Sequence, residues 1–197
     1  MRGKDQKLWI DLETSGLDRK KHGVVQIAGA IEINYKLINT FNYTMRLFPG
    51  DRISKKSIET HGFTIDDIKK FIPPHNQFIQ IVKMLREYVD PGDKRDKFTM
   101  FAYNADFDYG FLRTWWEKNN SPFFGSYVWY PPVDVMTKAA EVLQPERHLL
   151  KNMKLKTVAK YLGINVDESK LHDAFYDIEL TRDVYHRLLY HDGTPPF

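Results

Sequence analysis

The spacing of the first three strand-like segments constrains the fold of this chain more than any other feature. Residues 7–13, 24–34 and 39–48 are rich in apolar and β-branched residues, as strands usually are. The stretches between them are too short to hold the crossover helix that parallel neighbours need. We therefore expect these segments to form an antiparallel meander.

The first segment, KLWIDLE, has a strict alternation that assigns its faces. Successive side chains of a strand point to opposite sides of a sheet. Trp9, Asp11 and Glu13 are therefore expected on one face, and the three aliphatic residues between and before them on the other.

The rest of the chain predicts alternating helices and strands. Helices are expected over residues 64–71, 76–88, 106–118, 136–143, 155–162 and 174–190, and strands over residues 98–103 and 133–135. A meander followed by such units predicts an α/β fold with a five-stranded mixed sheet, in which parallel strands follow the antiparallel ones and helices cover both faces. A length of 197 residues suits one domain, over residues 1–197.

Composition narrows the class of protein. The chain is 42% hydrophobic and 28% charged and has no cysteine, which excludes disordered and disulfide-stapled classes and thiolate metal sites. No apolar run is long enough to span a bilayer, and the charged N-terminus does not resemble a signal peptide. We therefore expect an intracellular, cytoplasmic protein without a membrane partner. The net charge of +3 and the pI near 8.9 favour a polyanionic partner only weakly.

Asp11 and Glu13 form the first candidate site. They are two residues apart at the end of a strand, so their side chains project from the same face. Two buried carboxylates this close repel each other strongly unless a cation neutralises them. The alternative is a pair of solvated acids at a strand end.

Asp108 and Asp177 are two further acids in unusual places. Each lies beside the apolar stripe of a predicted helix, where an unpaired charge is costly. Taken singly, either could be a core-edge acid paired with Lys or Arg. Together with the first pair they offer four carboxylates to hard cations such as Mg²⁺ or Mn²⁺. Two such ions, roughly 3.5–4 Å apart, can bracket a phosphodiester.

His172 is the candidate proton acceptor. It precedes Asp177 by five residues, about 140° around a regular helix, so the two cannot share a helical face. We therefore place His172 in the loop or first turn before the last helix, leaning over the site. An imidazole titrates near neutral pH and can accept a proton from an attacking water. The alternative is an ordinary histidine, since the chain has seven.

Three ordered motifs carry a family resemblance: DLETSGL (residues 11–17), YNADFD (103–108) and HDAFYD (172–177). They resemble the three motifs of the DEDDh family of 3′→5′ exonucleases, which includes proofreading epsilon subunits, ribonuclease T, oligoribonuclease and the three-prime repair exonucleases. The segments IETHGFT (58–64) and LKTVAKYLGI (155–164) are also similar to that family. The resemblance thus spans nearly the whole chain and implies a ribonuclease-H-like fold.

The resemblance also implies roles for single residues. Its metal ligands fall on Asp11, Glu13, Asp108 and Asp177, and its general base falls on His172. Its contacts to the 3′-terminal nucleotide fall on Thr14 and Leu17, with the leucine wedged against the last base. His61 lies in a segment that often lines the same pocket, and Asn104 braces the site. Tyr103, where the epsilon subunits usually carry histidine, and the additional acid Asp106 depart from the pattern and bear on which strand end is accepted.

Two weaker features have alternative readings of equal or greater weight. Lysines could neutralise backbone phosphates or simply be solvated; they are Lys20, Lys21, Lys151, Lys154, Lys156 and Lys160. The aromatic loop 122–132 could stack unpaired bases, but aromatic residues beside a short strand are more often core.

We therefore expect a metal-dependent 3′→5′ exonuclease that uses two Mg²⁺ ions, or Mn²⁺ in their place, and releases nucleoside 5′-monophosphates. Its partner is a nucleic acid with a free 3′ end, single-stranded ends and DNA being favoured. The alternatives are an RNA-trimming exoribonuclease of the same family, a catalytically silent nucleic-acid-binding module that serves a polymerase, and a ribonuclease-H-like endonuclease. Because the chain ends soon after its last predicted helix, stand-alone action is expected, with a DNA polymerase acting in trans as the alternative partner.

Overall fold

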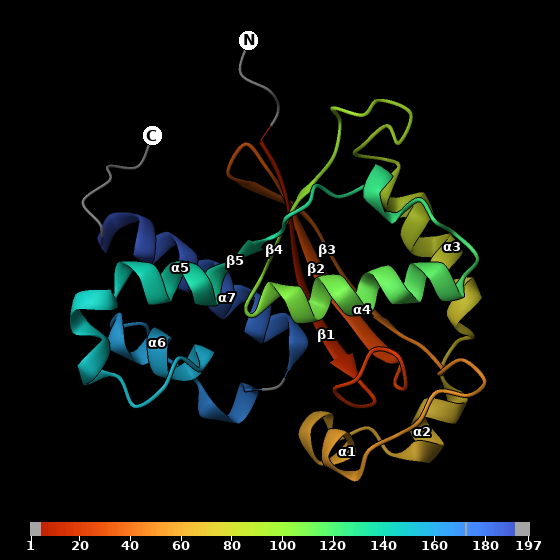
Figure 1. Ribbon diagram of the computed structural model, residues 1–197, viewed down its shortest axis with the longest axis horizontal. Coiled ribbons are helices and arrows are strands. Elements are labelled where there is room, and N and C mark those ends of the chain that lie inside the picture. The colour runs from red at the N-terminus through yellow and green to blue at the C-terminus, as the bar shows by residue number, and fades with distance from the viewer. Residues whose placement is uncertain (1–4, 172, 192–197) are drawn as a thin grey trace.

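The computed structural model describes residues 5–171 and 173–191 and contains a five-stranded mixed sheet with helices on both faces (Figure 1). The strand order is β3-β2-β1-β4-β5. The strands are β1 (Gln6–Thr14), β2 (Val24–Ile33), β3 (Lys36–Thr44), β4 (Thr99–Ala102) and β5 (Val133–Asp134). β1, β2 and β3 pair antiparallel, whereas β4 and β5 continue the sheet in parallel. The predicted ribonuclease-H-like fold class is confirmed by this order.

Helices pack on the sheet in two layers. The α-helices are α1 (Lys55–His61), α2 (Ile65–Lys70), α3 (Pro74–Leu85), α4 (Ala105–Lys118), α5 (Val135–Val142), α6 (Leu155–Tyr161) and α7 (Ala174–His191). Short 3-10 turns are η1 (Phe124–Ser126), η2 (Gln144–Leu149) and η3 (Glu168–Lys170). α4 and α3 bury their apolar sides on one face of the sheet, and α7, backed by α5 and α6, covers the other (Figure 1).

Alternation in β1 divides the core as predicted. Leu8, Ile10 and Leu12 join the cluster beneath α3 and α4. Trp9 joins the cluster beneath α7, where its ring packs against Phe101 and Tyr185. The face of β1 that carries Trp9 also carries Asp11 and Glu13.

Both predicted boundaries of the third strand were wrong, each for a local reason. The third strand begins at Lys36 rather than at residue 39, because Asn34 and Tyr35 both adopt positive φ and make a two-residue hairpin turn. It ends at Thr44, and the next residue, Met45, donates its N–H to the Val25 carbonyl of β2 at 2.8 Å and forms an isolated bridge with Ile72.

The helix α1 was not predicted at all. It buries none of its residues, so it has no apolar stripe by which sequence could reveal it. Ser54 starts it by accepting a hydrogen bond from the Ser57 N–H, and Gly62 ends it with a left-handed conformation.

A buried ionic network joins α7 to the sheet. Glu32 of β2 is only 1% exposed and accepts hydrogen bonds from Lys7 of β1 (3.1 Å) and from Arg182 of α7 (2.9 Å). These hydrogen bonds to two cations hold the pKa of Glu32 below its ordinary value, although burial opposes them. The network fixes α7 against the strands that it crosses. Within the described residues, no helix is long and apolar enough to cross a membrane.

We expect the substitution Glu32→Ala to lower the free energy of unfolding by about 3–5 kcal/mol, because it leaves two cations without their buried counterion. Urea denaturation measures the change. Asp66→Ala, which removes one partner of the exposed pair with Lys69, serves as the control and should cost less than about 1 kcal/mol. Equal losses in the two variants would contradict this role for Glu32.

Candidate functional site

Asp11 and Glu13 lie where β1 ends and two helices begin. Asp11 pairs with Ala28 in the β1–β2 ladder and Glu13 with Gln26, and the register shifts immediately after Glu13. Such a bulge bends a strand and redirects its side chains. Both carboxylates are partly buried. The central strand thus presents two acids on one face, at its carboxyl end.

Asp108 reaches the same place from α4. It lies in the first turn of the helix, is 5% exposed, and its Oδ1 accepts a hydrogen bond from the Leu12 N–H at 3.1 Å. Leu12 separates Asp11 from Glu13 in the sequence. This single contact therefore fixes the beginning of α4 against the acid-bearing end of β1.

Asp177 comes from the opposite layer. It lies in the first turn of α7, and its N–H donates to the Asp173 carbonyl at 2.9 Å. Its charge contributes to the raised pKa of both Asp11 and Glu13. Acids in the first turn of a helix are favoured by the helix dipole, and both α4 and α7 place one there.

The gathered carboxylates raise one another's pKa. Burial, and then the charges of Asp108 and Glu13, raise the pKa of Asp11 well above its ordinary value. Burial and the charge of Asp177 raise the pKa of Glu13 to about 7. Burial also raises the pKa of Asp108, although the Leu12 N–H opposes it. Within the described residues, Asp11, Glu13 and Asp108 have no Lys or Arg at ion-pair distance that would offset these effects.

The carboxylates converge without closing into a compact metal cage. Among residues 5–171 and 173–191, no three or more His, Asp or Glu side chains are grouped as closely as metal ligands. The donor set nevertheless fits a hard divalent cation, since it consists of carboxylate oxygens.

The four residues predicted to contact substrate differ in their surroundings. Leu17 is 80% exposed on the loop after β1, whereas Thr14 is buried and its hydroxyl donates to the Gly16 carbonyl at 2.9 Å. Asn104 precedes α4 in a left-handed conformation, and its N–H donates to Asp134 Oδ1 at 3.1 Å.

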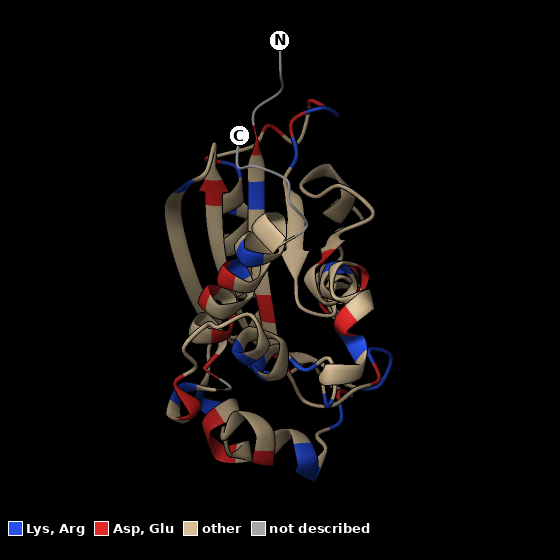
Figure 2. Ribbon diagram, turned by 90° about the vertical axis from the view of Figure 1, so that its left-hand side faces the viewer, with Lys and Arg blue, Asp and Glu red and all other residues tan. Residues whose placement is uncertain are grey.

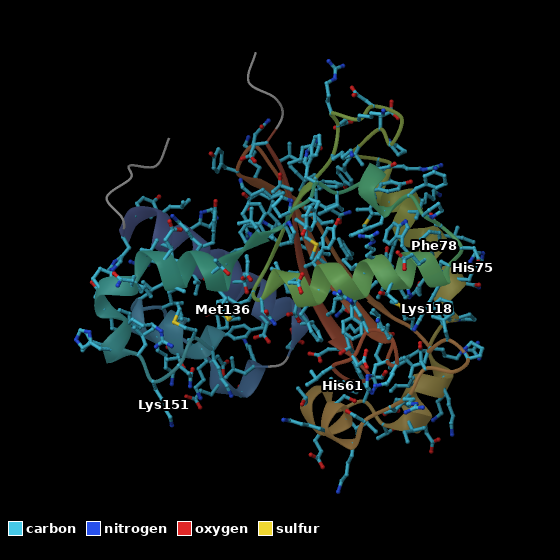
Figure 3. All side chains as sticks on the ribbon, in the orientation of Figure 1. His61, His75, Phe78, Lys118, Met136 and Lys151 are labelled. Atoms are coloured by element: carbon cyan, nitrogen blue, oxygen red, sulfur yellow. The ribbon has the colours of Figure 1, made fainter. Side chains whose placement is uncertain are left out.

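His61 lies at the end of α1, beside the end of β1 (Figure 3). It lines a pocket of about 350 Å³ together with Gln26 and Asp173. Its Nδ1 accepts a hydrogen bond from the Phe63 N–H at 3.0 Å, whereas its Nε2 is buried without a partner. Burial lowers the pKa of His61. His172, the predicted proton acceptor, lies outside the described residues.

Asp134 is a further acid of the site that sequence reasoning missed. Its Oδ1 accepts hydrogen bonds from the N–H groups of Asn104 (3.1 Å) and Met136 (2.9 Å), so it caps α5 and joins that helix to the start of α4. Its charge contributes to the raised pKa of Asp108. The sequence signal was an aspartate between a short strand and a helix, which is typical of a helix cap.

Tyr103 and Asp106, the two residues that depart from the family pattern, have different surroundings. The Tyr103 hydroxyl donates to the Met153 carbonyl at 2.6 Å, which ties the end of β4 to the segment before α6. Asp106 is exposed on the outer side of α4.

Comparison with known proteins agrees with this geometry. The sequence pattern of the family described as Exonuclease (RNase_T) matches residues 8–185. DNA polymerase III subunit epsilon of Buchnera aphidicola is 25% identical over 94% of this chain and 71% of its own length. Ribonuclease T of the same organism is 24% identical over 91% of this chain and 82% of its own length.

Solved structures show the same fold. Exonuclease I of E. coli in complex with a dT13 oligonucleotide superposes with a TM-score of 0.73 and 18% identity over 94% of this chain, which spans only 41% of that protein. The nuclease domain of 3′hExo, a DEDDh family member bound to rAMP, gives a TM-score of 0.70 and 14% identity over 96% of this chain and 94% of that domain.

A mixed sheet that gathers carboxylates at the end of its first strand defines the class of ribonuclease-H-like exonucleases. Within that class, the chain belongs to the Exonuclease (RNase_T) family, whose pattern covers most of its length. Exonucleases of this type are metal-dependent.

We expect metal-free protein to lose stability as the pH rises. Because the pKa of Glu13 is raised from 4.5 to about 7 on folding, its stabilising contribution is fully present below about pH 4.5 and is lost as the pH rises through about 7. The raised pKa values of Asp11 and Asp108 act in the same sense. Urea denaturation in EDTA at pH 5 and pH 8 measures the effect.

Glu13→Gln should reduce this pH dependence, and Glu179→Gln, at an exposed position of α7, should leave it unchanged. Identical profiles for the wild type and the Glu13 variant would contradict the account.

Proposed function

We propose that this protein hydrolyses the terminal phosphodiester of a nucleic acid at its 3′ end and releases nucleoside 5′-monophosphates. The observation that carries the proposal is the hydrogen bond from the Leu12 N–H to Asp108, which brings a helix-borne carboxylate to a strand end that already carries two. The family membership of the chain supports the same reaction class.

The metal site of the proposal consists of Asp11, Glu13, Asp108 and Asp177. Four carboxylates suit two Mg²⁺ ions, with Mn²⁺ as a substitute, together with a phosphate. When bound, the ions would offset the repulsion among the carboxylates, polarise the phosphodiester and lower the pKa of nearby water. The protein's own part is to hold these oxygens in place, through the backbone contact of Asp108 and the anchoring of α7 by Glu32.

We assign the binding of the substrate's 3′-terminal nucleotide to the loop after β1 and to the pocket beside α1. Leu17 is exposed and free to pack against a terminal base. Because His61 Nδ1 accepts the Phe63 N–H, the neutral ring carries its proton on Nε2, which can donate a hydrogen bond to a sugar or base oxygen. Thr14 and Asn104 shape the backbone around this end. His172 is proposed to accept the proton of the attacking water, a role that rests on the family resemblance.

The polymer acted on is proposed to be a single-stranded 3′ end, with DNA preferred. Solved neighbours include exonuclease I bound to single-stranded DNA oligonucleotides. RNA is the competing substrate, because one relative is a ribonuclease T and another neighbour holds rAMP. A DNA polymerase is a partner to test in trans, since a polymerase III epsilon subunit is among the relatives.

We expect purified protein with Mg²⁺ to release mononucleotides from linear single-stranded DNA, to leave closed circles intact, and to stop in EDTA. Chromatography of the products from matched DNA and RNA oligonucleotides measures the reaction. No mononucleotide from any linear substrate with Mg²⁺ or Mn²⁺ would contradict the proposal, and cleavage of circles would show an endonuclease instead.

Asp108→Asn should lower kcat by about a thousandfold or more, because a carboxylate of the metal site is lost. Asp106→Asn is the matched control: it removes an exposed acid two residues away on the same helix and should keep kcat within about twofold. His172→Ala should lower kcat by about 10²–10⁴-fold, as loss of a general base does. An Asp108 variant as active as the Asp106 variant would overturn the assignment.

A further inference from the structure

Arg19 crosses α4 at Gly110. A Cβ added to Gly110 would lie 1.8 Å from Arg19 Nη1, 2.9 Å from Cζ and 3.1 Å from Cδ, and these three are its nearest neighbours. Gly110 is buried although it lies away from the core side of the helix, whereas Arg19 is exposed. The guanidinium thus lies on α4 in a space that any residue larger than glycine would fill.

The charge of Arg19 has no counterion within the described residues. Its near neighbours Lys20 and Arg52 likewise have no carboxylate at ion-pair distance there, whereas Lys21 pairs with Asp18 at 2.9 Å. The two segments that carry these cations are joined, because the Arg52 N–H donates to the Lys21 carbonyl at 2.7 Å. Three uncompensated cations therefore gather on adjoining loops.

This gathering is local and does not follow from the overall charge. Figure 2 shows Lys and Arg interspersed with Asp and Glu along the ribbon. Elsewhere on α4 the cations have partners: Arg113 pairs with Glu117 at 3.3 Å, and Lys118 pairs with Asp51. The loop after β1 thus carries cations, Arg19 and Lys20, that have no ion-pair partner among the described residues.

Arg19 contacts α4 two residues after Asp108, but it does not neutralise the carboxylates of the site. Gly110 follows Asp108 by two residues, a separation of about 5 Å between Cα atoms and about 200° around the helix. Asp108 points to β1, whereas Arg19 covers the opposite side of α4. A polyanion that enters the site and continues over α4 would meet this guanidinium.

We propose that Arg19, seated on α4 at Gly110, binds a backbone phosphate of the strand upstream of the hydrolysed bond. The inference rests on the proposed function and adds a contact that none of the three motifs predicts. A guanidinium suits this task because it can give two parallel hydrogen bonds to phosphate oxygens. Its loop is already ordered: the N–H groups of Lys21 and His22 both donate to the Asp18 carbonyl at 2.9 Å.

The first test is Arg19→Ala, assayed on a single-stranded DNA oligonucleotide over a range of salt concentrations. We expect kcat/KM to fall about tenfold, mainly through KM, as for the loss of a charge-assisted contact. The slope of log kcat/KM against log salt should become shallower by about 0.7, the value for one phosphate on a single strand. Arg113→Ala removes the same charge from the outer side of α4 and should change neither quantity.

The second test is Gly110→Ala, whose new methyl group must displace Arg19. We expect it to reproduce the loss and the shallower salt slope of Arg19→Ala in the wild-type background, and to add nothing in the Arg19→Ala background. Thermal denaturation checks that each variant is folded. Additive effects of the two substitutions would overturn the proposal that glycine acts by seating this arginine.

Binding to metal-free protein separates this inference from the proposed function. Fluorescence anisotropy in EDTA measures the affinity for a labelled oligonucleotide without hydrolysis, and Arg19→Ala should weaken it and flatten its salt dependence. A wild type that binds through Arg19 yet releases no mononucleotide would contradict the proposed function alone. An active wild type for which Arg19→Ala and Arg113→Ala have the same salt slope would overturn the inference alone.

Discussion

Repulsion among buried carboxylates is the interaction on which the rest of this structure depends. Asp11 and Glu13 project from one strand end, and Asp108 is held at the same strand end by the Leu12 N–H. Each of the three has a raised pKa, with burial as the largest cause. Such an arrangement destabilises the folded chain at neutral pH unless a cation is bound. A fold that keeps it must supply stability elsewhere, and must hold the acid-bearing elements rigidly enough to resist separation.

The sheet and its two layers supply both. Alternation along β1 places aliphatic side chains under α4 and Trp9 under α7. The strand that carries the acids is therefore packed on both of its faces. Glu32 ties α7 to the sheet through Arg182, and Asp134 ties the start of α4 to α5. The acids of α4 and α7 lie in first turns, where the helix dipole partly offsets their charge. Stability and site geometry therefore come from the same contacts.

The sequence predicted those features of the fold and the site that follow from local periodicity. The alternation of β1 fixed the face that carries Asp11 and Glu13, and the position of Asp108 beside an apolar stripe identified it as a buried acid, as observed. Sequence could not show features that depend on tertiary contacts or lack an apolar pattern. One such feature is α1, none of whose residues is buried. Another is the hairpin turn at Asn34 and Tyr35, which contains no glycine. The seat of Arg19 on Gly110 joins residues ninety-one positions apart, which no local pattern encodes.

Calorimetric titration of metal-free protein with Mn²⁺ near pH 6.5, in buffers of different ionisation enthalpy, tests the central claim most directly. If the acids share protons because they repel, a divalent cation must displace those protons as it binds. The account predicts binding with net proton release for the wild type, and a smaller release for Glu13→Gln. Binding without proton release, or no binding at all, would contradict it.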